Sequence, residues 1–152
     1  MDDLQIRMMK LAAEGYYCSQ ILLQLALEAR GEENPALVRA MAGPAYGCGS
    51  GRATCGALTG GCCLLALYAA KGSGTERESD RLFLMLSELS DWFEQAVGGR
   101  FGGIACETIT GEEGPAAARR RCGGIVAETF AKALEILLVN DFDPYAPAES
   151  AS

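Results

Sequence analysis

Histidine is absent from this chain of 152 residues. Because histidine is the commonest general base near neutral pH and the usual axial ligand of haem iron, its absence disfavours both kinds of site. A serine nucleophile would also lack its usual activating base, so hydrolysis ranks lowest among the candidate reactions. Cys-x-x-Cys and Cys-x-x-Cys-His runs are missing too, which disfavours a zinc ribbon and attached haem. We therefore expect no haem, and chemistry that uses other side chains.

Basic residues are few as well. The chain has 13 Lys and Arg residues against 20 Asp and Glu residues, which gives a net charge of −7. Binding to nucleic acid needs clustered basic side chains that displace counterions from phosphates. The one basic run, Arg119-Arg120-Arg121, is too short to supply such a cluster. We therefore expect no nucleic-acid partner.

Long apolar runs are also missing. The most apolar stretch, residues 55–70, is shorter than the ~20 residues that a membrane helix needs, and it contains three glycines. The first residues, Met1-Asp2-Asp3, are acidic where a secretory signal is basic. These features predict a cytoplasmic protein that does not insert into a membrane and whose cysteines stay in a reducing compartment.

Helical periodicity dominates the sequence, and no stretch alternates apolar and polar residues as a strand does. The pattern predicts an all-α, single-domain bundle of about five to six helices around a central helix rich in glycine and cysteine. We expect helices over residues 3–13, 18–29, 35–42, 55–71 and 75–97, and a last helix that starts near 116 or 122 and ends at 139. The domain should span residues 1–139, followed by a tail without regular structure over residues 140–152.

Several local signals set the expected helix ends. Gly15 and Gly31 should end the first two helices, and Asn34-Pro35 should begin the third. Residues 43–54 form a glycine-rich loop that permits unusual backbone angles. The run from Thr75 to Glu78 fits a capping box, so we expect a helix to start there.

Seven cysteines stand out: Cys18, Cys48, Cys55, Cys62, Cys63, Cys106 and Cys122. Their odd number, together with the expected location, predicts free thiols rather than a disulfide framework. Cys55 lies at the predicted start of the central helix, where free backbone N–H groups and the helix dipole stabilise a thiolate. We therefore expect its pKa to be depressed. Gly56 beside it has no side chain, so a substrate, a cluster or a neighbouring backbone can approach the sulfur.

The other cysteines differ in their expected roles. Cys62 follows Cys55 by seven positions on nearly the same helix face, about 10 Å away along the axis, which excludes a disulfide between them. We expect Cys62 and its neighbour Cys63 to be packing residues. Cys48 is expected either to approach Cys55 as a resolving thiol or ligand, or to fill a gap.

Two further cysteines occupy positions that favour a thiolate. Cys18 lies at the expected start of the second helix, where backbone N–H groups are free. Cys122 follows the three arginines, whose positive charge would lower the pKa of its thiol. The arginines also fit a solvated surface without any effect on the thiol.

Four cysteine-bearing segments follow one another along the chain. They are Gly15-Tyr16-Tyr17-Cys18-Ser19-Gln20, Cys55-Gly56-Ala57-Leu58-Thr59-Gly60, Phe101-Gly102-Gly103-Ile104-Ala105-Cys106-Glu107, and Arg121-Cys122 before a terminal helix. Together they resemble the C_GCAxxG_C_C family of putative redox-active proteins. The resemblance covers nearly the whole chain and implies four characteristic cysteines, which by order and context are Cys18, Cys55, Cys106 and Cys122. Cys48, Cys62 and Cys63 would be additions.

Two redox mechanisms follow if these four cysteines converge. As ligands, with Gly56 beside them, they suit an iron–sulfur cluster used for electron transfer, and zinc is less favoured. As a dithiol, Cys55 would attack as a thiolate, and Cys106 or Cys122 would resolve the mixed disulfide. Either mechanism needs a redox partner that the sequence does not identify.

The competing interpretation is a non-catalytic binding or assembly protein. Free cysteine is among the most buried residue types, so all seven thiols could serve as small core hydrophobes. The glycine-containing central helix would then allow close helix packing or form the interface of a homo-oligomer.

Overall fold

The computed structural model describes residues 2–111 and 113–146. They form α1 (Asp3–Ala13), α2 (Cys18–Ala29), α3 (Pro35–Ala40), α4 (Ala45–Cys48), α5 (Gly56–Ala69), α6 (Leu82–Phe93), a π-helical turn η1 (Glu94–Gly98), α7 (Gly99–Phe101), α8 (Cys106–Thr110), α9 (Pro115–Arg121) and α10 (Gly123–Val139). No strand occurs in these residues, and the one β-bridge joins Thr54 to Ala105. The prediction of an all-α fold is confirmed.

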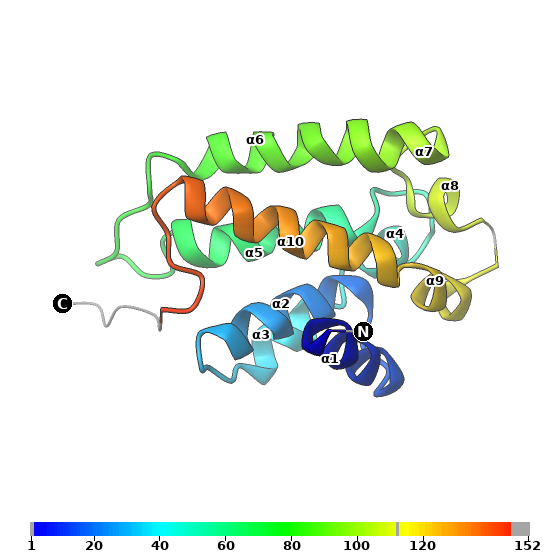
Figure 1. Ribbon diagram of the computed structural model, residues 1–152, viewed down its shortest axis with the longest axis horizontal. Coiled ribbons are helices and arrows are strands. Elements are labelled where there is room, and N and C mark those ends of the chain that lie inside the picture. The colour runs from blue at the N-terminus through cyan, green and yellow to red at the C-terminus, as the bar shows by residue number, and fades with distance from the viewer. Residues whose placement is uncertain (1, 112, 147–152) are drawn as a thin grey trace.

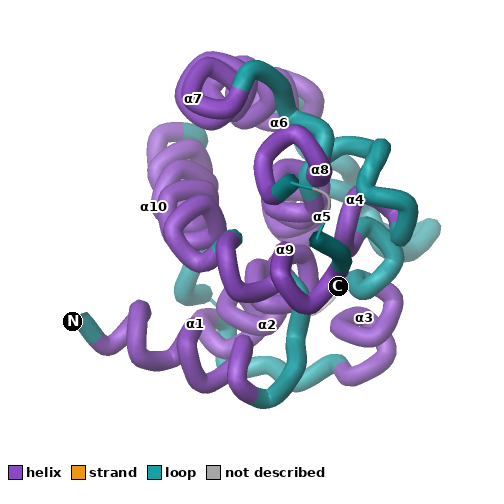
Figure 2. The backbone as a smooth tube through the Cα atoms, turned by 90° about the vertical axis from the view of Figure 1, so that its right-hand side faces the viewer, coloured by secondary structure: helices purple, strands orange, loops and turns teal. Residues whose placement is uncertain are grey.

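Helix α5 is the centre of the bundle. It packs against α2 on one side and α6 on the other, and α10 runs beside it (Figures 1 and 2). Two of its glycines permit this close packing. A Cβ atom on Gly60 would lie 2.8 Å from the Cα atom of Ser19 in α2, and one on Gly61 would lie 2.9 Å from Leu89 in α6. The small residues of the central helix therefore set how closely α2 and α6 approach it.

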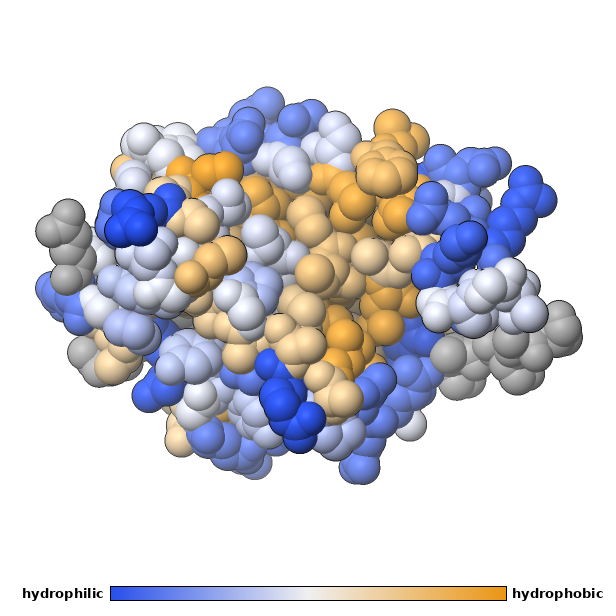
Figure 3. All heavy atoms as spheres, turned by 180° about the vertical axis from the view of Figure 1, so that it is seen from behind, coloured by the Kyte–Doolittle hydropathy of each residue, from blue (hydrophilic) through white to orange (hydrophobic). Residues whose placement is uncertain are grey.

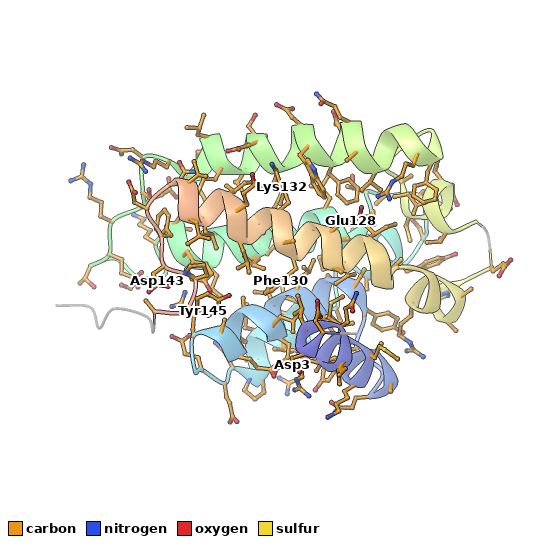
Figure 4. The ribbon with its side chains drawn as sticks, in the orientation of Figure 1. Asp3, Glu128, Phe130, Lys132, Asp143 and Tyr145 are labelled. Carbon is orange, nitrogen blue, oxygen red and sulfur yellow. The ribbon has the colours of Figure 1, made fainter. Side chains whose placement is uncertain are left out.

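The core is built from the apolar stripes of the long helices. Fully buried side chains come from α1, α2, α5, α6, η1 and α10: Leu11, Leu22, Leu23, Leu27, Leu64, Leu65, Met85, Leu89, Phe93, Val97, Ile136 and Leu137. Figure 4 shows how α10 divides its faces, with Phe130 directed toward α2 and with Glu128 and Lys132 on the side toward α6. Glu128 accepts a hydrogen bond from Arg100 of α7 at 2.7 Å, which links α7, at the far end of the segment that begins with α6, to α10.

Most of the predicted helix ends are confirmed. Helices α1 and α2 have the expected bounds, and Gly15 and Gly31 follow them with φ of +99° and +68°. These are left-handed conformations that glycine adopts at little cost. The side chain of Asn34 accepts a hydrogen bond from the backbone N–H of Leu37 at 3.1 Å, so Asn34 caps α3 as expected.

The predicted helix start at Thr75 is wrong, because α6 begins at Leu82. The two residues of the expected capping box do not bond each other. The Thr75 hydroxyl pairs with Ser73 at 3.0 Å, and the backbone N–H of Ser79 donates to Ala69 at the end of α5. Residues 76–80 are polar and almost all of them are exposed, so a helical turn there would bury no apolar face.

The second half of the chain differs from the prediction in two further places. Helical structure continues past Val97 through η1 and α7, and it ends at Gly102, where φ is +81°. The expected last helix is two helices, α9 and α10, which meet at Cys122. Residues 98–101 are therefore helical, beyond the predicted helix end at residue 97.

The chain beyond α10 folds back along the bundle. Residues 141–146 form no helix, and Pro144 accepts a hydrogen bond at 2.6 Å from the hydroxyl of Tyr68 in α5. Asp143 and Tyr145 lie on this segment beside the end of α5 (Figure 4). The part of the predicted tail over residues 147–152 lies outside the described residues.

Two surface properties bear on possible partners. In the described part of the chain, every helix is too short or too polar to cross a membrane. On the face turned away in Figure 1, apolar side chains gather on the surface (Figure 3). Phe83 and Leu84 of α6 are exposed, at 72% and 66%. A homo-oligomer stays a prediction.

Candidate cysteine site

Four cysteines share one kind of position in the fold. Cys18 is the first residue of α2 and Cys106 the first of α8, whereas Cys55 and Cys122 immediately precede α5 and α10. At such positions the backbone N–H groups of the first helical turn have no partner within the helix and face the residue at the helix start. The four thiols therefore lie where a negatively charged sulfur is best stabilised.

A short backbone pairing holds Cys55 and Cys106 together. Thr54 and Ala105 form an antiparallel bridge. The N–H of Cys55 donates to the carbonyl of Ile104 at 2.7 Å, and the N–H of Cys106 donates to the carbonyl of Ala53 at 3.0 Å. Helices α5 and α8 consequently start from the same pair of segments. The sequence does not reveal this pairing, since two paired residues leave no periodic signal.

Cys18 reaches the same place from α2. A Cβ atom on Gly56 would lie 2.8 Å from the sulfur of Cys18 and 3.1 Å from the carbonyl oxygen of Pro44. The missing side chain of Gly56 is thus the space into which the Cys18 sulfur packs, directly beside Cys55. The predicted approach of a substrate, a cluster or a backbone to the Cys55 sulfur stays a prediction, and the space beside Gly56 holds the Cys18 sulfur.

Cys122 completes the group. Cys122 and Cys18 both line a cavity of about 570 Å³ between α1, α2, α9 and α10. Ionisation of Cys55 or Cys106 would raise the pKa of the Cys122 thiol, and all three raise that of Cys18. Cys55 and Cys106 thus lie side by side at the paired segments, Cys18 packs beside Cys55 at Gly56, and Cys122 lines the same cavity as Cys18.

The predicted depression of the Cys55 pKa is wrong. Burial raises the pKa of this thiol, which is 0% exposed, and the hydrogen bonds from the backbone of Ala57 and Leu58 oppose that rise without cancelling it. The loss of hydration on burial penalises the thiolate more than the helix start stabilises it. Without a bound cation, this thiol is neutral at pH 7.

The other three thiols follow the same rule. Burial raises the pKa of Cys122 to about 12, with smaller contributions from Cys55 and Cys106, so the preceding arginines do not produce the expected thiolate. Burial also raises the pKa of Cys18 and Cys106, although the hydroxyl of Thr110 lowers that of Cys106. All four are neutral thiols in the metal-free chain.

A strained turn packs against this group. Tyr46, Gly47 and Cys48 have φ of +51°, +52° and +55°, so α4 contains three consecutive left-handed residues. This conformation costs about 1–2 kcal/mol for each residue other than glycine. A Cβ atom on Gly47 would lie 3.1 Å from the Cβ of Cys106 and 2.7 Å from the carbonyl oxygen of Ala53. The predicted permissive loop thus adopts unusual backbone angles where it packs behind Cys106, and such strain often accompanies functional sites.

The three additional cysteines do not lie at helix starts. Cys62 and Cys63 are partly buried in α5 and pack against the core, in agreement with their predicted packing role. Burial raises the pKa of both thiols. Cys48 is exposed on the left-handed turn, so it fills no gap in the core.

The grouping of side chains bears on which metal would fit. Within residues 2–111 and 113–146, no three Cys, Asp or Glu side chains are close enough to hold one metal ion. A mononuclear cage such as a four-cysteine zinc site needs all its sulfurs on one atom. The four thiols as they stand do not form such a cage.

One family model matches this chain. It covers residues 16–136 and describes the family as "Putative redox-active protein (C_GCAxxG_C_C)". No curated protein and no solved structure matches. The matched range contains all four cysteines that lie at helix starts, together with the turn and the bridge that support them. The chain therefore belongs to the C_GCAxxG_C_C family.

Proposed function

We propose that Cys18, Cys55, Cys106 and Cys122 bind an iron–sulfur cluster and that the protein transfers electrons. The observation that supports the proposal is that four cysteines distant in the sequence all lie at helix starts, with Cys18 beside Cys55, Cys55 paired to Cys106 through the backbone, and Cys122 on the same cavity as Cys18. Their separation in the sequence makes chance convergence a poor explanation, and the family's redox description agrees with the proposal.

The donor set fits such a cluster. Four cysteine thiolates are the usual ligands of both [2Fe–2S] and [4Fe–4S] clusters. The cysteines are distributed over two or four iron atoms, so a cluster does not need three thiols close to one ion. Helix N-termini point N–H groups at bound anions, and each of the four cysteines lies at the start of a helix. When bound, the cluster would accept and donate single electrons.

The chain's own residues would supply binding and insulation. Each thiol must lose its proton to become a ligand, and a bound cation makes that loss favourable despite the raised pKa. Gly56 leaves room for the Cys18 sulfur, and the bridge at Thr54 holds Cys55 beside Cys106. Burial of Cys55, Cys106 and Cys122 keeps water away from the sulfurs, which is one determinant of the reduction potential.

Thiol–disulfide exchange is the second candidate, and the position of Cys18 favours it. Cys55 is fully buried and out of reach of a partner disulfide, whereas Cys18 is partly exposed at a cavity. The Cys18 thiolate would attack a partner disulfide and release one partner thiolate. Cys55, after losing its proton, would then attack the mixed disulfide, release the second partner thiolate and leave a Cys18–Cys55 disulfide. The raised pKa of both thiols makes this route slow at neutral pH.

Anaerobic purification with analysis of iron and acid-labile sulfide separates the two mechanisms. The proposal predicts both elements, with charge-transfer absorption in the visible range, in the intact protein and in the control Cys63→Ser. Cys55→Ser should lose most of the absorption. An intact protein that binds neither element but forms a reversible disulfide between two of the four cysteines would favour exchange instead. Seven slow, unreactive thiols and no metal would support the non-catalytic alternative and contradict both.

A further inference from the structure

The cavity beside the cysteine site has the properties of a small-molecule site. Its volume of about 570 Å³ lies within the roughly 300–1,000 Å³ that is typical of ligand pockets. Helix α1, the start of α2, the end of α9 and the start of α10 border it. Its lining is mainly apolar, with Met8, Met9, Ala12, Ile21, Val126 and Ala127, and it includes Gln5, Arg119 and the two thiols of Cys18 and Cys122.

Two glycines keep this cavity open. Gly123 and Gly124 form the first turn of α10 and line the cavity. Neither has a positive φ, and a Cβ atom on either would meet no atom within 4 Å. Packing and backbone conformation therefore do not require glycine here, although each glycine costs a helix about 1 kcal/mol relative to alanine. Both glycines therefore leave open space along the cavity that Cys122 also lines.

Arg119 is the charged residue in the lining of the cavity. Its guanidinium lies over the ring of Tyr17, 5.5 Å from the centroid, and donates to the carbonyl of Gly15 at 3.3 Å. It pairs with no carboxylate among the described residues. In a chain with a net charge of −7, an arginine without an acidic partner at an apolar cavity is suited to an anionic ligand group.

We propose that this cavity binds a small molecule with an apolar body and one anionic group, such as an aromatic carboxylate or sulfonate. The apolar body would pack against Met8, Met9 and Ile21, whose flexible or branched side chains adapt to a bound ring. The anionic group would bind Arg119. A ligand in this position would lie against Cys18 and Cys122. The inference concerns the metal-free chain and does not rest on the proposed function.

Two fluorescent probes test the proposal on the full chain. Anilinonaphthalene sulfonate has an apolar body and one sulfonate, and N-phenyl-1-naphthylamine is its neutral counterpart. We expect saturable binding of the anionic probe to one site per chain, with at least tenfold weaker binding in Gly124→Leu, which fills the cavity. Gly99→Leu is the matched control, because Gly99 is also a helical glycine with open space, and it lies outside the cavity.

Arg119→Gln tests the recognition of charge. Binding of the anionic probe should weaken about tenfold, while binding of the neutral probe changes less than twofold. Thermal unfolding checks that the variants fold, and a leucine at Gly124 should stabilise α10 because leucine favours a helix more than glycine does and its Cβ atom would meet no atom within 4 Å. If Gly124→Leu does not fold, Gly123→Ala and protection of Cys18 from N-ethylmaleimide by the probe provide the same test.

Binding that is not saturable, or that is equal in Gly124→Leu and Gly99→Leu, would overturn the cavity site. Equal loss of both probes in Arg119→Gln would overturn the preference for anions.

Discussion

The two sets of cysteines in this molecule differ in an instructive way. Cys62 and Cys63 are adjacent in the sequence, lie within α5 and pack as partly buried side chains. Cys18, Cys55, Cys106 and Cys122 come from four segments, and each lies at the start of a helix. Burial raises the pKa in both sets, so burial alone does not distinguish them. The position relative to helix ends, and not closeness in sequence, marks the candidate site.

Cluster loading should have the largest effect on stability. This effect should depend only on the four cysteines at helix starts. A ligand present at 100 times its dissociation constant stabilises the fold by about 2.7 kcal/mol, which for this size of chain means a rise of roughly 5–10 °C in Tm. Thermal unfolding of loaded and metal-free protein should show this rise in Cys63→Ser and not in Cys55→Ser. The same rise in both variants would remove the distinction between the two sets.

Gly60→Ala should disturb the four-cysteine set through packing. The added methyl group would lie 2.8 Å from the backbone of Ser19, next to Cys18, so α2 must move away from α5. Overpacking of this kind costs about 1–3 kcal/mol, which urea denaturation measures. We also expect weaker iron binding than in the control Gly99→Ala, which adds a methyl group in open space outside the cavity. No loss of stability would show that the helices are not closely packed at this crossing.

Alkaline pH should destabilise the metal-free chain. The pKa of Cys122 is about 12 in the folded protein against 9.0 for an ordinary thiol. Between these two pKa values the unfolded chain binds fewer protons than the folded chain. Ionisation of this thiol on unfolding therefore lowers the free energy of unfolding by about 1.4 kcal/mol per pH unit as pH rises. Denaturation at pH 8 and pH 10 should show a smaller pH-dependent loss in Cys122→Ala than in the intact chain. Cys63 is only partly buried, so its replacement by alanine should reduce this pH-dependent loss of stability less.

The smallest effects should fall at the wrongly predicted capping box, outside both cysteine sets. Thr75→Ala and Glu78→Ala should each change stability by less than about 0.5 kcal/mol, as expected for exposed surface positions. Asn34→Ala removes a cap that does form and should cost about 1 kcal/mol. A loss of that size at Thr75 would mean that α6 starts earlier in solution.

Features that depend on local chemistry could be predicted from the sequence. The bounds of α1 and α2, the cap at Asn34 and the glycine-rich turn all follow from residues close to one another in the chain. The positions of the cysteines at the starts of α2 and α5 could also be predicted from neighbouring residues.

Features that depend on the whole fold could not be predicted. The sign of the Cys55 pKa shift depends on how much water the packed helices exclude, which no local pattern reveals. The late start of α6 depends on which residues can bury an apolar helix face against the rest of the fold. The cavity and the charge of Arg119 beside it arise only when α1 and α10 pack together.

Iron and acid-labile sulfide measured after anaerobic reconstitution of all seven single Cys→Ser variants provide the most direct test of the central claim. The account predicts that the variants of Cys18, Cys55, Cys106 and Cys122 lose most of both elements, and that the variants of Cys48, Cys62 and Cys63 retain them. Full loading of a variant from the first set, or equal loss across all seven, would contradict the claim that these four thiols form one site.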